Sequence, residues 1–316
     1  MRYLVTGGAG FIGSNIVKAL VQHGDKVRVL DNFSTGRRQN LKEIESDIEI
    51  IEGDICDFWT VIDACREIDF VLHQAALPSV NRSVENPLTA NHTNINGTLT
   101  MLECARRNGV KKFFFASSSS VYGDTPTLPK REDMIPAPMS PYAVNKITGE
   151  YYCSVYSDLY KMPCIAFRYF NVFGPNQDPN SHYAAVIPKF INSLLADEQP
   201  TIFGDGLQSR DFTYIDNVVE GIIKACEMKN ATPGVYNLAC GGQYTLNELL
   251  KQLNELIGKN ITARYAEPRP GDIKHSFADV SKVAKVLGIT PTIDFRNGLE
   301  KTIAFYKREA LLKSRV

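Results

Sequence analysis

Tyr142 and Lys146 form a pair of side chains that could transfer a proton. They stand four residues apart at the start of a predicted helix, so both side chains lie on one helix face. The ammonium group would then stabilise the phenolate and lower the tyrosine pKa from about 10 toward the working pH. The spacing also arises by chance in unrelated proteins, so this prediction depends on the motifs around it.

Four consecutive serines, Ser117 to Ser120, end a predicted strand ahead of this helix. Serine is a poor strand former, so packing alone does not explain the run. Serine hydroxyls can donate hydrogen bonds to an alcohol or a forming ketone and can also accept them. We therefore expect part of the run to contact a substrate, while the rest could form a hydroxylated turn.

A glycine motif joins the first predicted strand to the first predicted helix. Gly7 permits a tight turn, Gly10 lets the backbone approach a pyrophosphate, and Gly13 allows the helix to pack closely on the strand. The helix N-terminus then offers unpaired N–H groups and a positive dipole end to the phosphates. Because a strand precedes the motif and an amphipathic helix follows it, the motif predicts a dinucleotide site.

Asp31 indicates which dinucleotide is bound, because it ends the second predicted strand, 18 residues after the glycine motif. A carboxylate there accepts hydrogen bonds from the adenosine ribose and repels a 2′-phosphate, which favours NAD over NADP. Arg37 and Arg38 lie nearby and could receive a phosphate, but we interpret them as surface charges. Asp54 and Ile55 follow the third predicted strand and are expected near the adenine.

Short apolar runs alternate with longer helical patterns through the first half of the chain. The predicted strands are Tyr3–Val5, Val27–Leu30, Ile48–Ile51, Phe70–His73, Phe113–Ser117 and Ile165–Tyr169. The predicted helices of this half are Ile12–His23, Leu88–Asn108 and Tyr142–Tyr160. This alternation predicts an α/β fold, a doubly wound parallel sheet of the Rossmann type with helices on both faces.

With 316 residues, the chain is expected to form about two units. Residues 1–170, with a returning segment at about 206–238, would form the dinucleotide-binding domain. Residues 171–316 would mainly form a smaller α/β lobe over the carboxyl ends of the strands, where ligands bind in open sheets. The predicted helices of this lobe are Val186–Leu195 and Leu246–Ile257.

Composition excludes several classes of function. Lys and Arg (35) balance Asp and Glu (35), which leaves no surplus positive charge for nucleic acid or a membrane surface. No apolar stretch approaches the roughly 18 residues of a membrane-spanning helix, and no signal peptide is expected. The 7 scattered cysteines indicate reduced thiols in a cytoplasmic protein. The 5 histidines lie far apart, so we expect no metal site.

Six motifs resemble those of a known family. They are TGGAGFIG (6–13), DNFSTG (31–36), HQAA (73–76), SSSSVYG (117–123), SPYAVNK (140–146) and RYFNVFGP (168–175). From Tyr3 to about Asp279 the chain resembles the extended short-chain dehydrogenase/reductase family. Within it, the chain is most similar to the UDP-hexose 4-epimerases, and closest to their UDP-N-acetylglucosamine branch. The resemblance implies an NAD-dependent isomerase that transiently oxidises C4 of a UDP-sugar, lets the 4-keto sugar rotate and returns the hydride.

The resemblance also implies roles for single residues. Tyr142 would be the catalytic base, Lys146 its activator and a contact of the nicotinamide ribose, and Ser118 the catalytic serine. Besides these and the glycines, the cofactor positions are Phe11, Ile12, Asp31, Asn32, Ser34, Gly36, Asp54, Ile55, Gln74, Ala75, Ala76, Asn94 and Phe170. Besides Ser118 and Tyr142, the positions that would hold the UDP-sugar are Ser119, Ser120, Asn171, Thr201, Phe203, Arg210, Arg269, Asp272 and Ser276.

Arginine forks suit a diphosphate because they can bind it in a bidentate way. Arg210 could instead pair with the adjacent Asp211, and Arg269 could be an ordinary loop charge. The helices Leu88–Asn108 and Tyr142–Tyr160 match those that form a four-helix dimer interface in the resembled family. A homodimer is therefore expected.

Three positions distinguish the members of this family. Dehydratases and the UDP-glucuronate decarboxylase carry an acid where this chain has Ser120, and without it elimination lacks a proton donor. UDP-glucuronate 4-epimerases usually have threonine in place of Asn171 but remain an alternative. Strict bacterial UDP-glucose 4-epimerases, a second alternative, have tyrosine in place of Ser276, and serine leaves room for an acetamido group. A non-catalytic dinucleotide sensor would typically lack the tyrosine–lysine pair.

Overall fold

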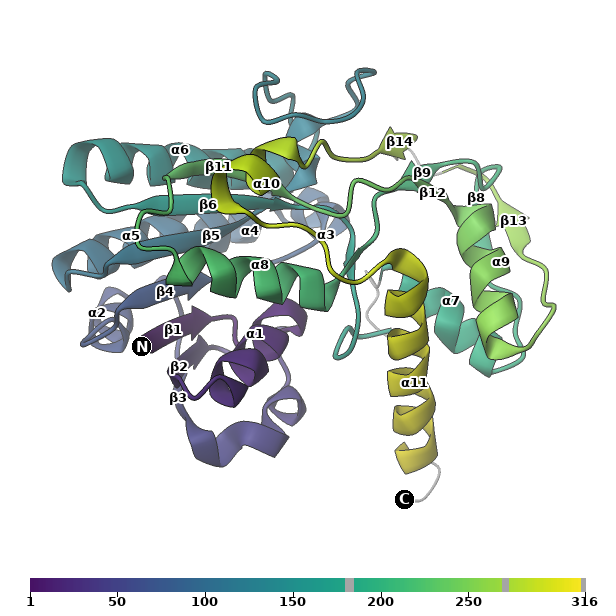
Figure 1. Ribbon diagram of the computed structural model, residues 1–316, viewed down its shortest axis with the longest axis horizontal. Helices are drawn as coiled ribbons and strands as arrows, with labels where there is room; N and C mark the ends of the chain where they lie inside the picture. Colours follow the sequence, from purple (N-terminus) through teal and green to yellow (C-terminus); the bar gives the residue numbers. More distant parts are fainter. Residues whose placement is uncertain (180–184, 269–272, 314–316) are drawn as a thin grey trace.

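A parallel sheet of seven strands forms the centre of the larger part of the protein (Figure 1). The computed structural model describes residues 1–179, 185–268 and 273–313. The strands of this sheet are β1 (Arg2–Thr6), β2 (Lys26–Asp31), β3 (Ile48–Glu52), β4 (Phe70–His73), β5 (Lys112–Ser118), β6 (Cys164–Tyr169) and β11 (Gly234–Leu238). Their order is β11-β6-β5-β4-β1-β2-β3, and every neighbouring pair is parallel. The predicted Rossmann-type sheet is therefore confirmed.

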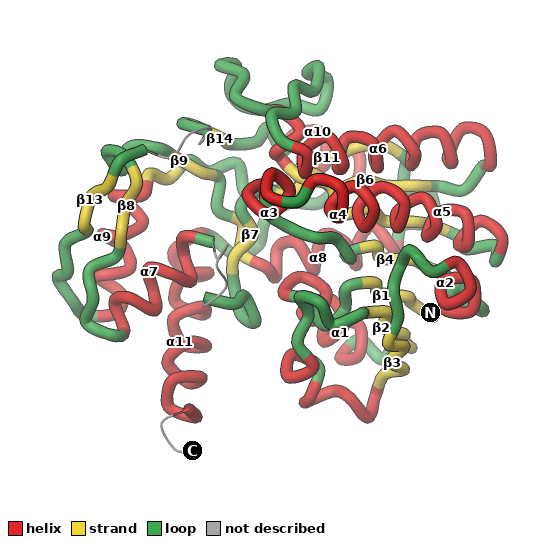
Figure 2. Tube along the Cα trace, turned by 180° about the vertical axis from the view of Figure 1, so that it is seen from behind, coloured by secondary structure: helices red, strands yellow, loops and turns green. Residues whose placement is uncertain are grey.

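Helices cover both faces of this sheet. The helices α1 (Phe11–Gln22) and α8 (Ile215–Glu227) pack together on one face (Figure 1). The other face is covered by α2 (Phe58–Ala64), α5 (Gly97–Arg107) and α6 (Pro141–Tyr160), as Figure 2 shows from behind. Successive residues of β1 point to opposite faces, so Leu4 and Val5 belong to different buried apolar clusters.

The predicted helix Leu88–Asn108 is not continuous. The structure has α3 (Val80–Glu85) and α4 (Pro87–Asn91), then a turn of π-helix (His92–Asn96), and only then α5. Within the π turn the Asn94 side chain bonds to the backbone of Leu77, and the Thr98 hydroxyl just beyond the turn donates to the Asn94 carbonyl at 2.7 Å. Such bonds compete with regular helix bonding, which explains why hydrophobic periodicity alone missed the break.

A smaller lobe lies beside the sheet, on the right of Figure 1. Its helices are α7 (Val186–Leu195), α9 (Leu246–Ile257) and α11 (Phe295–Lys313), and α10 (Ser281–Leu287) packs on β11. Its short strands pair as β8 (Thr201–Phe203) with β13 (Arg264–Ala266), and as β9 (Ser209–Arg210) with β12 (Tyr244–Thr245) and β14 (His275–Ser276). The strands β7 (Val172–Phe173) and β10 (Thr213–Tyr214) pair between the lobe and the sheet. None of the helices in the described residues could cross a membrane.

Candidate active site

The glycine motif forms the tight turn between β1 and α1. Gly7 has a φ of +67°, which favours glycine, and a Cβ on Gly13 would lie 2.1 Å from the Gly7 carbonyl oxygen. Gly10 is the N-cap of α1 and offers no side-chain acceptor to the first turn. The N–H groups of this turn are therefore available to an anion.

Asp31 lies beside this turn at the carboxyl end of β2. Its Oδ2 accepts the Ala9 N–H at 2.9 Å and its Oδ1 accepts the Phe33 N–H at 2.8 Å. Burial raises the pKa of the carboxyl group, and these two bonds oppose that rise. A Cβ on Gly36 would lie 2.9 Å from both carboxylate oxygens, so the chain passes very close to them. Each oxygen retains a lone pair for a ribose hydroxyl.

The two nearby arginines bind protein groups. Arg38 pairs with Glu52 and lies 4.1 Å above the centre of the Phe33 ring. Arg37 donates to the Asn176 carbonyl at 3.3 Å. Their contacts agree with the interpretation that they are surface charges.

Other predicted cofactor positions line the carboxyl edge of the sheet. Asn32 donates to Asp54 at 3.0 Å, and the Asn94 amide bonds to both the N–H and the carbonyl of Leu77. Gln74 accepts the Tyr169 hydroxyl at 3.0 Å, while its Nε2 is buried and has no partner among the described residues. The remaining positions of this set are Phe11, Ile12, Ser34, Ile55, Ala75, Ala76 and Phe170, of which Ile55 and Phe170 are buried.

The structure brings Tyr142, Lys146 and Ser118 together. The Tyr142 hydroxyl is hydrogen-bonded to Ser118, which also caps the next turn by accepting the Ser120 N–H at 3.2 Å. Lys146 is buried, with its Nζ 5.6 Å from the centre of the Tyr142 ring and donating to the Ala116 carbonyl at 2.7 Å. An ammonium, a phenol and a hydroxyl thus converge at one point.

The predicted direction of the Tyr142 pKa is wrong for the protein alone. Burial raises this pKa to about 12, against the lowering effect of the Ser118 hydrogen bond. Burial also lowers the pKa of Lys146 to about 8, and the charge of Glu150 opposes this change. Sequence spacing indicates the neighbours of a group but not the loss of solvent around it, and here the loss of solvent has the larger effect.

The serine run divides into different roles. The Ser117 hydroxyl donates to Glu150, whereas the Ser120 oxygen is buried with no partner in the described part of the chain. Glu150 was not predicted to belong to the site. Its position one helical turn beyond Lys146 is the signal that could have indicated it.

Four of the positions predicted for the sugar nucleotide, Thr201, Phe203, Arg210 and Ser276, lie in the smaller lobe. Thr201 and Phe203 are on β8, and Ser276 on β14 is paired with Arg210 on β9. Asn171 has a φ of +29°, a strained conformation that is common at functional sites. Arg269 and Asp272 lie outside the described residues.

Asp211 does not act as a simple partner of Arg210. Its carboxylate accepts the backbone N–H groups of Cys240, Gly241 and Ala278, at 3.1, 2.9 and 3.1 Å. Arg210 itself donates to the Ser209 carbonyl at 2.9 Å. Asp211 therefore holds together the backbone segments around Arg210.

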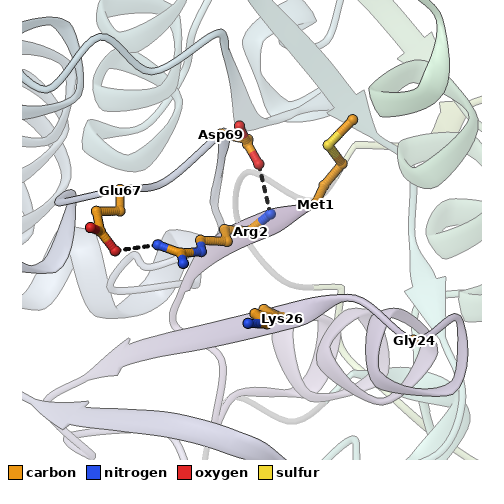
Figure 3. A pocket seen from close by; sticks show the side chains of 6 residues that line it. All are labelled: Met1, Arg2, Gly24, Lys26, Glu67 and Asp69. Carbon is orange, nitrogen blue, oxygen red and sulfur yellow. Dashed lines mark hydrogen bonds and ion pairs between the residues drawn. The ribbon is translucent and has the colours of Figure 1, made fainter.

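A hollow lies at the amino ends of β1, β2 and β4, the edge of the sheet opposite to the glycine turn. Figure 3 shows the six residues that line it, Met1, Arg2, Gly24, Lys26, Glu67 and Asp69. Arg2 pairs with Glu67, and its backbone N–H donates to Asp69 at 2.9 Å. Arg2 and Glu67 thus satisfy each other's charge, at the edge of the sheet opposite to the glycine turn. Across the described residues, no three His, Cys, Asp or Glu side chains gather so as to hold a metal ion.

Comparison with known proteins agrees with this geometry. The model of the NAD dependent epimerase/dehydratase family matches residues 3–239. A putative UDP-glucose 4-epimerase of Methanocaldococcus jannaschii is 38% identical, over 96% of this chain and 98% of its own length.

Two solved structures share the whole fold. A UDP-N-acetylglucosamine 4-epimerase from Methanobrevibacter ruminantium, in complex with UDP-N-acetylmuramic acid, has a TM-score of 0.93 and 41% identity over 98% of both chains. A UDP-glucose 4-epimerase of Thermus thermophilus, in complex with NAD, has a TM-score of 0.89 and 37% identity, over 97% of this chain and 99% of its own. With the family model covering most of its length and relatives of this similarity, the chain belongs to the NAD dependent epimerase/dehydratase family.

Proposed function

We propose that this protein catalyses the NAD-dependent 4-epimerisation of a UDP-hexose, with UDP-N-acetylglucosamine as its main substrate and UDP-N-acetylgalactosamine as the product. The meeting of Tyr142, Lys146 and Ser118, at the same edge of the sheet as the glycine turn, is the observation that carries this proposal. Residues 1–170, with the segment 206–238, would bind the cofactor, and residues 171–316 would mainly bind the UDP-sugar.

The residues at the carboxyl edge of the sheet fit NAD. The turn at Gly7 and Gly13 has no room for a side chain, and the capless start of α1 suits a pyrophosphate. Asp31 suits a free ribose 2′-hydroxyl, and the Nε2 of Gln74, which has no partner in the described ranges, offers a buried donor. When bound there, NAD would supply the hydride acceptor and donor that a reversible oxidation at C4 of the sugar requires.

Tyr142 handles the proton of this reaction. Its phenolate would take the proton of the sugar 4-hydroxyl as C4 is oxidised, and would give it back when C4 is reduced on the other face. Because burial favours the neutral phenol, the phenolate depends on positive charge nearby, which Lys146 supplies. Ser118 would hold the 4-oxygen through a hydrogen bond.

Inversion requires the 4-keto sugar to turn over between the two steps. We place the uridine end near Phe203 and the diphosphate near Arg210, both in the smaller lobe. A substrate held mainly by its nucleotide leaves the hexose free to rotate. The acetamido preference depends on Ser276, a small and buried side chain in register with Arg210. Strict UDP-glucose and UDP-glucuronate 4-epimerisation remain the alternatives.

We also propose that the protein is a homodimer. Apolar side chains that face solvent form a stripe along α4 and α6, whose members are Leu88, Val144, Tyr151, Val155 and Leu159. Leu88 is 83% exposed and Leu159 70%. A second copy placed against these contacting helices would cover the stripe.

All seven cysteines are unpaired, which fits our proposal that the protein works in the cytoplasm.

A substrate panel tests the proposed reaction. Purified protein with added NAD is offered UDP-N-acetylglucosamine, UDP-glucose and UDP-glucuronate, and the epimers are separated by chromatography or NMR. We expect UDP-N-acetylgalactosamine to form fastest. If only UDP-galactose forms, the acetamido preference is wrong but 4-epimerisation stands. If no UDP-sugar is converted, the proposed function is wrong.

A further inference from the structure

A buried ion pair lies directly behind the catalytic residues. Glu150 accepts two hydrogen bonds from Arg168, from Nε at 2.9 Å and from Nη2 at 2.7 Å. The two side chains are only 2% and 4% exposed. A buried pair of this kind gains little net stability over apolar residues of the same volume, because both charges lose their hydration. Stability alone therefore does not account for it.

Glu150 joins three elements that carry site residues. It lies on α6 with Tyr142 and Lys146, and its Oε1 also accepts the Ser117 hydroxyl at the end of β5. Ser117 directly precedes Ser118 in the chain. Arg168 belongs to β6, which leads to the strained Asn171. One carboxylate thus connects the helix of the base with the strand of the catalytic serine.

Glu150 also provides negative charge one turn beyond the Lys146 ammonium. The other groups that face Lys146 are Tyr142 on the same helix, the Ala116 carbonyl and the Phe115 ring on β5, and His73 on β4. Burial lowers the pKa of His73 to about 3, so this ring is neutral in the working range. Glu150 therefore opposes the desolvation that would otherwise remove the Lys146 proton.

We propose that Glu150, held by Arg168, is a positioning residue that keeps Lys146 charged and fixes Ser117 so that Ser118 and Tyr142 stay aligned. This inference rests on the proposed function, in which Lys146 supports the Tyr142 phenolate. Without the carboxylate, the buried Lys146 loses its proton at lower pH. At high pH Lys146 is then neutral and no longer stabilises the Tyr142 phenolate.

The test compares Glu150→Gln with the wild-type full-length protein carrying NAD, using the UDP-hexose that the panel shows to be converted best. We expect kcat at pH 8 to fall at least about tenfold with KM changed less than about twofold. The alkaline limb of the kcat profile should move down by about one pH unit. Glu150→Asp, which keeps the charge, should restore the position of this limb. A purely structural role would lower kcat equally at every pH, and that result overturns the proposal.

A second readout does not need turnover. The pH dependence of the Kd for NAD, measured by calorimetry, should have its midpoint at lower pH in Glu150→Gln, because Lys146 adjoins the cofactor site. If no UDP-sugar is converted but this midpoint moves, the proposed function fails and the inference about Glu150 stands. If the midpoint does not move, the inference about Glu150 is wrong whether or not a UDP-sugar is converted.

Two further variants guard against misfolding. Ser117→Ala removes only the link to β5, so it should lower kcat several-fold and leave the alkaline limb in place. If Ser117→Ala has the same kcat at every pH as the wild type, the proposed role of the contact between Glu150 and Ser117 is contradicted. Glu103→Gln is the matched control, since Glu103 pairs with Arg106 and Arg107 on α5 and meets α6 at the Tyr156 hydroxyl, ten residues beyond Lys146. Its pH profile should match that of the wild type.

Discussion

The Nζ of Lys146 lies 5.6 Å from the centre of the Tyr142 ring, one turn further along α6. Neither group is held by the other. The ammonium is fixed by the Ala116 carbonyl and the phenol by Ser118, and both partners belong to β5. The end of this strand therefore sets the distance between base and cation, so a substitution there should affect catalysis more than substrate binding.

Replacement of Tyr142 by phenylalanine should lower kcat by about 10³-fold, because general acid–base catalysis contributes on this scale. The Kd for NAD should stay within about twofold, since only the hydroxyl is lost. Steady-state rates and calorimetry check these two numbers. Tyr160→Phe, a change at the end of the same helix at a side chain that is 49% exposed, is the control. A Tyr142→Phe variant that keeps a tenth of the activity would contradict the role of the base.

Asp31→Asn should weaken NAD binding about 10- to 100-fold, because a hydrogen bond from the ribose to a charged acceptor is lost. The affinity for NADP should fall less, since the repulsion of its 2′-phosphate also disappears. Calorimetry with both dinucleotides measures the change. Asp63→Asn, at an exposed surface pair with Arg66, should change neither affinity. An unchanged ratio of the two affinities would argue against Asp31 as the discriminating group.

The fold was predictable because its strands are buried on both faces. Leu4 and Val5 point to opposite sides of the sheet, yet both meet apolar clusters, so β1 forms a continuous apolar run. The helix Val186–Leu195 and the strand Phe70–His73 have the predicted bounds. Continuous burial and strong amphipathicity are local properties that a single sequence displays.

The rest depends on contacts between distant segments. The Asn94 side chain in the π turn at His92–Asn96 bonds to Leu77, 17 residues earlier in the chain, and hydrophobic periodicity does not encode such a contact. The raised pKa of Tyr142 comes from burial, and Arg168 reaches Glu150 from another strand. Motif spacing therefore predicted the reacting groups. Their pKa shifts and the residues that hold them in place depend on the folded structure.

Ser276→Tyr should abolish turnover of UDP-N-acetylglucosamine and preserve that of UDP-glucose within about tenfold. The tyrosine ring would fill the space that we assign to the acetamido group, and a clash of this kind discriminates strongly. The ratio of kcat/KM for the two substrates is the measurement. Ser276→Ala, which keeps the volume small, should leave the ratio near that of the wild type. If both substrates are lost equally, Ser276 does not control the acetamido preference.

Leu159→Arg should convert the proposed dimer to a monomer, because it places a charge in the apolar stripe of α4 and α6. Sedimentation at micromolar protein would show half the mass of the wild type. Since Leu159 is 70% exposed, the thermal stability of the single chain should change little. Leu312→Arg, at an exposed leucine near the end of α11, is the control and should leave the mass unchanged. A wild-type protein that sediments as a monomer would contradict the dimer.

Asp211 should make the stability of the protein fall as pH rises from about 4 to about 6. Burial raises the pKa of this carboxyl from 3.8 to about 6, even though three backbone N–H groups donate to it. Between these values the folded state binds more proton than the unfolded state, so raising the pH favours unfolding. A rise of this size corresponds to about 3 kcal/mol.

Urea unfolding of the wild type and of Asp211→Asn between pH 4 and pH 7 isolates this effect, because the other carboxyl groups titrate alike in both proteins. The free energy of unfolding of the wild type minus that of Asp211→Asn should decrease as pH rises and become constant above about pH 7. If this difference instead grew with pH, the three N–H donors would stabilise the carboxylate more than burial destabilises it. Asp211 would then hold the backbone segments around Arg210 most strongly when its carboxyl group is ionised.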